Sequence, residues 1–170
     1  SRSATDPRLR TWLTDSGSLT ARLQGKGAFS LRLLRQGRQI PLHDEAGTFG
    51  LHVRSPVFTR EVILHVNDTP QVFARTILPF APRGRLSRRL VRLGTRSLGS
   101  LLFSHPGFVR HALRFISLDP RHPLYPRAAL ALKIPYGVRL SARRSVFLYG
   151  REGRAAVLVT EVFSPGLGTL

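Results

Sequence analysis

Two pairs of apolar segments constrain the fold of this chain more than any other feature. Val57–Val66 and Gln71–Leu78 are rich in β-branched and aromatic residues, and the turn-forming sequence Asn67-Asp-Thr-Pro70 joins them. Ser141–Tyr149 and Ala155–Phe163 form a similar pair, which a short polar segment joins. Such segments with short connections are typical of antiparallel β-hairpins. The sequence therefore predicts two hairpins.

Helical patterns lie mostly before and between these hairpins. Asp6-Pro7 is typical of a helix N-cap followed by proline in the first turn, and Ser18 precedes a second short helix. Further helices are predicted at Leu86–Leu93, Leu98–Phe103 and Pro106–Phe115, and the polar segment Gln36–Gly50 is predicted to be a loop. This arrangement predicts an α+β fold, with a single antiparallel β-sheet and helices packed on one face.

The length and charge of the chain define its broad class. With 170 residues and 42% hydrophobic content, residues 1–170 are expected to form a single globular domain. The formal net charge is +18, and only Lys26 and Lys133 are lysines among the 27 basic residues. Such a charge attracts an anionic partner, and nucleic acid, a lipid headgroup and a small carboxylate all remain open. A bias toward arginine in composition would give the same pattern.

Several classes of site are excluded or disfavoured by the residues themselves. The absence of cysteine excludes disulfides and thiolate sites, and the six histidines show no metal-binding spacing, so no metal is expected. No phosphate-binding or dinucleotide motif is present, and no cofactor is expected. The first ten residues contain no apolar signal segment, and no apolar run is long enough to span a membrane. These features predict a cytoplasmic protein.

The densest basic stretch runs from Arg83 to Arg96, and its leucines 86, 90 and 93 form one apolar helical face. Three interpretations remain open: a solvated helix face, a nucleic-acid contact, or weak peripheral contact with a membrane. No helix-turn-helix, zinc-finger or aromatic RNA-binding pattern supports nucleic acid, so no nucleic-acid partner is expected.

Two charged residues lie on strand faces that are otherwise apolar. Glu161 shares a face with Val157, Val159 and Phe163, because side chains alternate along a strand. Arg60 is placed in the same way among Phe58, Val62, Leu64 and Val66. A buried charge without a partner is unfavourable. The sequence therefore predicts either a buried ion pair or a pocket for an anion.

An ordered set of short motifs resembles the chorismate pyruvate-lyase family from about Pro7 to Pro165. The motifs are Trp12-Leu13, Ser16-Gly-Ser-Leu-Thr20, Arg60-Glu-Val-Ile-Leu64, Val72-Phe-Ala-Arg-Thr-Ile-Leu-Pro79, Leu93-Gly-Thr-Arg-Ser-Leu-Gly-Ser-Leu-Leu-Phe103, Ala142-Arg-Arg-Ser145 and Thr160-Glu-Val-Phe-Ser-Pro165. The resemblance implies a six-stranded antiparallel sheet, a closed pocket and a carbon–oxygen lyase without cofactor or metal. The implied reaction removes pyruvate from chorismate and yields 4-hydroxybenzoate, a precursor of ubiquinone.

The resemblance also implies roles for four residues. Arg60 would bind the ring carboxylate and Glu161 the ring hydroxyl, while main-chain amides of Leu19 and Leu98 would contact the ligand. Leu19 stands where some members have methionine, which matters little for a main-chain contact. The proline-rich stretch 117–140 does not align clearly.

Chorismate itself is a dianion, which suits a chain rich in arginine. Burial on an apolar face is expected to raise the pKa of Glu161, which would let it act as an acid. Arg75 and Arg144 are candidates for the second carboxylate, although either could instead be structural. The alternative function is a non-catalytic, small-carboxylate-sensing domain of the same fold. A monomer is expected.

Overall fold

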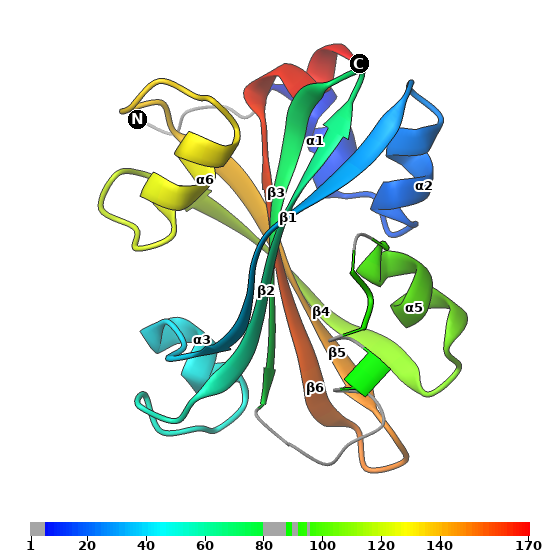
Figure 1. Ribbon diagram of the computed structural model, residues 1–170, viewed down its shortest axis with the longest axis vertical. Coiled ribbons are helices and arrows are strands. Elements are labelled where there is room, and N and C mark those ends of the chain that lie inside the picture. The colour runs from blue at the N-terminus through cyan, green and yellow to red at the C-terminus, as the bar shows by residue number, and fades with distance from the viewer. Residues whose placement is uncertain (1–5, 80–87, 90–91, 95) are drawn as a thin grey trace.

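The two predicted hairpins lie side by side in one six-stranded antiparallel sheet (Figure 1). The computed structural model describes residues 6–79, 88–89, 92–94 and 96–170. The strand order is β1-β2-β3-β6-β5-β4, so pairing of β3 with β6 joins the hairpins and leaves β1 and β4 at the edges. The strands are β1 (Phe29–Gln39), β2 (Val57–Val66), β3 (Thr69–Pro79), β4 (Phe108–Leu118), β5 (Leu140–Tyr149) and β6 (Arg154–Phe163).

The turn between β2 and β3 shows why this hairpin could be predicted. Asn67 and Asp68 have φ angles of 50° and 62°, and two successive positive φ angles match the right-handed twist of the flanking strands. The Asn67 side chain also accepts a hydrogen bond of 2.9 Å from the Ala28 N–H, just before β1. One turn therefore fixes the β2–β3 hairpin and the start of the neighbouring strand.

Helices cover both faces of the sheet, whereas the sequence pattern placed them on one. On one face lie α1 (Pro7–Leu13), α2 (Leu19–Gln24), α5 (Leu98–Ser104) and the 3₁₀ helix η1 (Pro165–Thr169). On the other lie α3 (His43–Thr48) and α6 (Tyr125–Ala131) (Figure 1). The reason is that the central strands are apolar on both sides. Phe73 and Val162 pack with α6, while the adjacent Val72 and Phe163 pack with α1 and α2.

The capping signals near the N-terminus are confirmed. The Asp6 carboxylate accepts a hydrogen bond of 2.9 Å from the Arg8 N–H at the start of α1. The Ser18 hydroxyl accepts one of 3.3 Å from the Ala21 N–H at the start of α2. Local side-chain chemistry is sufficient to define these short helices.

Two other local expectations differ from the structure. The segment Pro106–Phe115, predicted as a helix, is largely the edge strand β4, which pairs with β5 from Phe108 to Leu118. The polar segment 36–50, predicted as a loop, holds the end of β1 and helix α3. Pairing with a neighbouring strand outweighs the local pattern in both strands. The predicted helix Leu86–Leu93 lies largely outside the described residues, and only 88–89 are seen as helical. None of the helices in the described ranges is long and apolar enough to cross a membrane.

A buried ion network ties α3 and α6 to the face of the sheet that they cover. The Arg75 guanidinium donates to both carboxylate oxygens of Glu45, at 2.7 and 3.0 Å, and to Glu61 at 2.6 Å. Arg127 on α6 binds the other oxygen of Glu61. Glu45, Glu61 and Arg75 are each no more than 2% exposed. Two carboxylates and two guanidinium groups thus balance one another, and of the four only Arg127 is partly exposed.

Replacing Glu45 with glutamine is expected to lower the free energy of unfolding by about 3–5 kcal/mol, because it leaves a buried guanidinium short of a negative partner. Urea denaturation followed by circular dichroism measures the change. Glu152→Gln is the matched control, since Glu152 binds Arg154 at a site where both side chains are over 70% exposed. The control should give no measurable change. Equal stability of both variants and the parent would contradict a stabilising role for the network.

Candidate functional site

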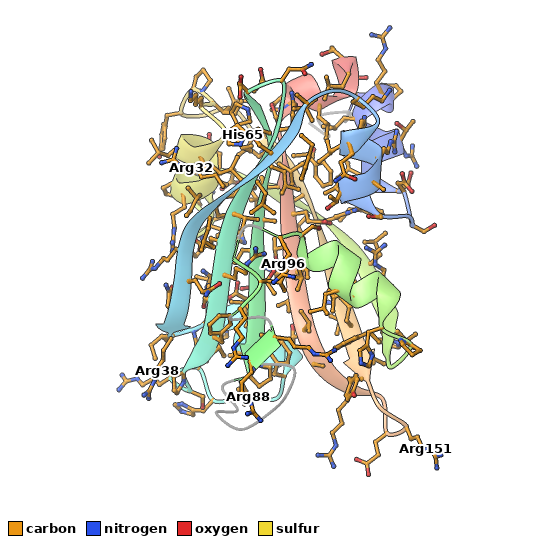
Figure 2. The ribbon with its side chains drawn as sticks, turned by 45° about the vertical axis from the view of Figure 1, so that its right-hand side comes forward. Arg32, Arg38, His65, Arg88, Arg96 and Arg151 are labelled. Carbon is orange, nitrogen blue, oxygen red and sulfur yellow. The ribbon has the colours of Figure 1, made fainter. Side chains whose placement is uncertain are left out.

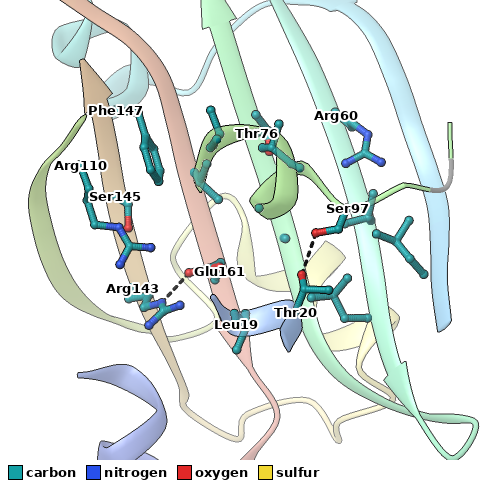
Figure 3. Close-up of a pocket in the computed structure, with 18 residues that line it drawn as sticks. Leu19, Thr20, Arg60, Thr76, Ser97, Arg110, Arg143, Ser145, Phe147 and Glu161 are labelled. Carbon is teal, nitrogen blue, oxygen red and sulfur yellow. Dashed lines mark hydrogen bonds and ion pairs between the residues drawn. The ribbon is translucent and has the colours of Figure 1, made fainter. Parts of the chain in front are cut away.

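A pocket lies between the sheet and the helices α2 and α5 (Figure 3). It contains about 590 Å³ of space not filled by atoms, part of it open to solvent, and side chains from all six strands contribute to its lining. The Thr20 hydroxyl on α2 and the Ser97 hydroxyl before α5 lie 2.7 Å apart, so a hydrogen bond joins the two covering elements. The pocket is therefore bounded by the sheet on one side and by α2 and α5 on the other.

Most of the pocket wall is apolar. Leu64, Ala74, Leu102, Phe147 and Val159 contribute hydrocarbon surface from different elements. A wall of this kind excludes water and leaves the few polar groups to orient a ligand.

Arg60 provides one polar end of the pocket. It comes from β2, is 2% exposed, and its Nη2 donates to the carbonyl oxygens of Gly94 and Arg96 at 2.8 and 2.9 Å. Its Nε–H is buried and has no hydrogen-bond partner among the described residues. Burial lowers the pKa of this guanidinium, and no carboxylate within the described residues forms an ion pair with it. An anion reaching this end would therefore find an unpaired donor on a buried cation.

Glu161 lies toward the other end, and it is paired with Arg143 rather than with Arg60. These two residues are direct neighbours across the β5–β6 pairing, and the Arg143 Nε donates to a Glu161 oxygen at 2.5 Å. Glu161 remains 12% exposed, whereas Arg143 is almost fully buried. Arg143 also has a buried Nη2 without a partner in the described part of the chain. The pair accounts for the buried carboxylate that the sequence pattern singled out.

Arg143 and Arg110 also hold the segment between α1 and α2. The Arg143 Nη1 donates to the carbonyl oxygens of Trp12 and Asp15, at 3.2 and 2.7 Å. Arg110, from β4, donates to the Ser16 carbonyl oxygen at 3.3 Å. The Arg110 guanidinium lies 5.4 Å from the ring centre of Phe147, and burial, together with the charge of Arg143, lowers its pKa. The two arginines of the pocket thereby hold the chain segment between α1 and α2 in place beside it.

The two polar ends are well separated. Figure 3 shows Arg60 on the opposite side of the pocket from Arg110 and Arg143, with Glu161 between them. Arg60 is on β2 and Arg143 on β5, three positions apart in the sheet. At the usual strand spacing this separates their backbones by about 14 Å, and the long side chains reach inward. A ligand with two negative groups on an apolar frame fits this distribution of charge.

Arg75 and Arg144, the sequence candidates for a second carboxylate, do not line this pocket. Arg75 belongs to the buried network described above. Arg144 binds the Asp44 carboxylate at 2.6 Å and the Thr160 hydroxyl at 3.0 Å, on the face of the sheet that α3 covers. Leu19 and Leu98, in contrast, do line the pocket, together with Arg60 and Glu161. Four of the six residues singled out from the sequence therefore meet at one place.

Comparison with known proteins shows to which family the chain belongs. A profile of the chorismate lyase family matches residues 3–167, almost the whole chain. This chain belongs to the chorismate lyase family. A relative from Dechloromonas aromatica, named "Probable chorismate pyruvate-lyase", is 48% identical over 169 residues, which cover 97% of this chain and 91% of that protein. A relative of the same name from Cupriavidus metallidurans is 46% identical and is covered over 74% of its length.

Solved structures outside the chorismate lyase family share the fold. The effector domain of PhnF from Mycobacterium smegmatis aligns with a TM-score of 0.61 at 18% identity, covering 86% of this chain and 88% of that domain. A GntR-family transcriptional regulator from Enterococcus faecalis aligns with a TM-score of 0.58 at 15% identity, covering 81% and 90% of the two chains. Similarity at this level of identity establishes the sheet and its helices and nothing about the ligand.

Sequence reasoning missed Arg143 and Arg110 as pocket residues. Arg143 and Arg144 are consecutive, so they point to opposite faces of β5, and the apolar neighbours of Arg144 made it the stronger candidate. The available signal was that Arg143 shares its face with Ser145 and Phe147, which also line the pocket. Arg110 was hidden because its segment was expected to be helical. No group of three or more metal-binding side chains occurs among the described residues.

Proposed function

We propose that this chain is a chorismate pyruvate-lyase, which eliminates pyruvate from chorismate and forms 4-hydroxybenzoate for ubiquinone biosynthesis. The observation that carries the proposal is the buried guanidinium of Arg60, whose Nε–H has no partner among the described residues. It lies at one end of an apolar pocket whose other end holds Arg110 and Arg143. Chorismate has one carboxylate on its ring and one on its enolpyruvyl group, joined by a largely apolar frame. Family membership and the named relatives support the same substrate.

Arg60 binds the ring carboxylate in this proposal. Its Nη2 is engaged by the Gly94 and Arg96 carbonyl oxygens, but its Nε–H has no hydrogen-bond partner among the described residues. A carboxylate oxygen is the acceptor that best satisfies such a charged donor. The main-chain N–H groups of Leu19 and Leu98 add donors nearby. Both residues begin short helices, where N–H groups have no acceptor within the helix, and both line the pocket.

Glu161 contacts the ring hydroxyl. Because its carboxylate already accepts a hydrogen bond from Arg143, we assign it the role of an acceptor and not of an acid. An acceptor at this point fixes the ring carbon that carries the hydroxyl and the hydrogen lost in the reaction. The fixed ring then presents the neighbouring carbon–oxygen bond toward the Arg143 end.

The reaction needs little beyond this orientation. The bond between the ring carbon and the ether oxygen breaks, the adjacent ring carbon loses a proton, and the ring becomes aromatic. The departing enolpyruvate gains a proton and becomes pyruvate. Positioning the substrate and stabilising the negative charge that develops on the leaving oxygen are the contributions that a pocket of this kind can make. A guanidinium near the leaving oxygen stabilises this developing negative charge.

Arg143, with Arg110 beside it, is the proposed contact for the enolpyruvyl carboxylate. Arg143→Ala is expected to raise KM for chorismate by about tenfold to 100-fold, because a charged hydrogen bond is lost. Arg144→Ala is the matched control, one residue away on the opposite face of β5, and should leave KM within about threefold of the parent. Steady-state kinetics on both variants measures the difference. A larger rise in KM from Arg144→Ala than from Arg143→Ala would identify Arg144 as the contact for the second carboxylate.

The proposed function is tested by incubating the purified chain with chorismate. Pyruvate is followed with lactate dehydrogenase, and the aromatic product is identified by chromatography. Equal amounts of pyruvate and 4-hydroxybenzoate are expected. Tight binding of chorismate or 4-hydroxybenzoate without turnover would instead support the small-carboxylate-sensing function, and neither binding nor turnover would contradict both.

A further inference from the structure

One end of the sheet carries a concentration of arginine that the pocket does not use. At this end β1 stops, β2 begins, β3 stops, and the turn joins β5 to β6, as the pairs Gln39–Val57, Val57–Pro79 and Tyr149–Arg154 show. We call it the arginine end. Its exposed basic residues are Arg38, Arg54, Arg88, Arg89, Arg92, Arg151 and Arg154. Figure 2 shows Arg38, Arg88 and Arg151 at this end, with Arg151 on a projecting hairpin.

Acidic side chains are distributed in the opposite way. Among the described residues, the acids near the other end of the sheet are Asp6, Asp15, Asp68 and Asp119. At the arginine end the exposed acids of the described residues are Asp44, on α3 just after β1, and Glu152, and they are already paired with Arg144 and Arg154. Basic residues such as Arg8, Arg10 and Arg121 are exposed at the other end too, where acids lie among them, so the net positive charge is larger at the arginine end.

Apolar side chains project from the same end. Ile40 follows β1 and Val53 precedes β2. Val109 lies at the start of β4, opposite Leu148, and Tyr149 lies at the end of β5, opposite Phe108. Their exposed fractions are 57%, 38%, 61% and 45%. The Tyr149 ring also packs at 4.9 Å from Phe108, which leaves its outer part accessible. A row of arginines alone attracts any polyanion, but aliphatic side chains gain nothing from a sugar–phosphate backbone.

We propose that the arginine end docks on a membrane surface that contains anionic lipids. Arginines bind the phosphate headgroups, while Ile40, Val53, Val109 and Tyr149 enter the boundary between headgroups and acyl chains. Both kinds of group lie at the same end of the sheet, and an aromatic residue with a polar tip suits such a boundary. The proposal does not depend on the reaction that the pocket catalyses.

The test is flotation of the full chain with lipid vesicles. Binding is expected with vesicles of phosphatidylcholine and phosphatidylglycerol and not with phosphatidylcholine alone. The combined variant Arg88→Gln, Arg89→Gln and Arg151→Gln should lower the partition coefficient by about 100-fold, since each arginine near an anionic surface contributes about fivefold. The matched control, Arg8→Gln, Arg10→Gln and Arg121→Gln, removes the same charge from exposed positions at the other end and should stay within about threefold of the parent.

A second variant separates a membrane from nucleic acid. Ile40→Ser with Val109→Ser keeps every charge and should weaken vesicle binding while leaving binding to duplex DNA unchanged. Failure of the parent to float with anionic vesicles would overturn the proposal, as would equal losses in the two charge variants. So would vesicle binding that the serine variant does not alter, because it would reduce the interaction to charge alone.

Discussion

Replacing Arg60 with alanine is expected to lower kcat/KM for chorismate by about 100-fold, or about 2.7 kcal/mol. The physical reason is that the ring carboxylate would enter an apolar pocket without the buried guanidinium that Arg60 offers. Isothermal titration with 4-hydroxybenzoate should show a similar loss of affinity, because the product keeps the ring carboxylate. Arg60→Lys should recover only part of the activity, since one ammonium group cannot replace both the Nε–H donor and the Nη2 hydrogen bonds to the Gly94 and Arg96 carbonyl oxygens.

A stability measurement distinguishes the loss of substrate binding from unfolding of the variant protein. Arg60 is a buried charge without an ion-pair partner in the described ranges, so an apolar replacement of similar length is not expected to destabilise the fold. Arg60→Met should therefore unfold at a urea concentration close to that of the parent, while its kcat/KM falls as far as that of Arg60→Ala. Normal turnover in a stable Arg60→Met variant would exclude Arg60 as the anchor.

Replacing Glu161 with glutamine is expected to lower kcat by about 100-fold to 1,000-fold, with a smaller effect on KM. Glutamine retains the size of the side chain but presents a weaker acceptor to the ring hydroxyl and leaves Arg143 without its carboxylate. Single-turnover kinetics, which isolates the chemical step, measures the effect. Glu161→Asp should retain more activity, because it preserves the negative charge.

The two variants distinguish binding from chemistry. If Arg60 binds the ring carboxylate and Glu161 orients the ring, replacing Arg60 acts mainly on substrate affinity. Replacing Glu161 then acts mainly on the rate of the chemical step. A Glu161→Gln variant with normal kcat and raised KM would show that Glu161 contributes only to binding.

The parts of the fold that could be predicted are those specified by local chemistry. The Asn67–Asp68 turn, the Asp6 and Ser18 caps and the alternation in the two hairpins act over a few residues, and the structure confirms them. The edge strand β4 could not be predicted in this way. Its pairing with β5 depends on residues about 30 positions away, and the isolated segment resembles a helix.

The residues of the candidate site also divide into those that could be predicted from the sequence and those that could not. Arg60 and Glu161 stand out because each interrupts an apolar strand face, and a strand face can be read from alternate residues. Their partners depend on register, which the sequence does not specify. Glu161 is paired with Arg143 because β5 and β6 align these two residues, and a shift of one position would bring Arg144 to that face instead.

The most direct test of this account is a crystal structure of the protein with 4-hydroxybenzoate. The account predicts the product in the pocket beneath α2 and α5, with its carboxylate on the Arg60 guanidinium and its hydroxyl toward the Glu161 carboxylate. A product bound outside this pocket, or one turned so that its carboxylate meets Arg143, would contradict the assignment of the two ends.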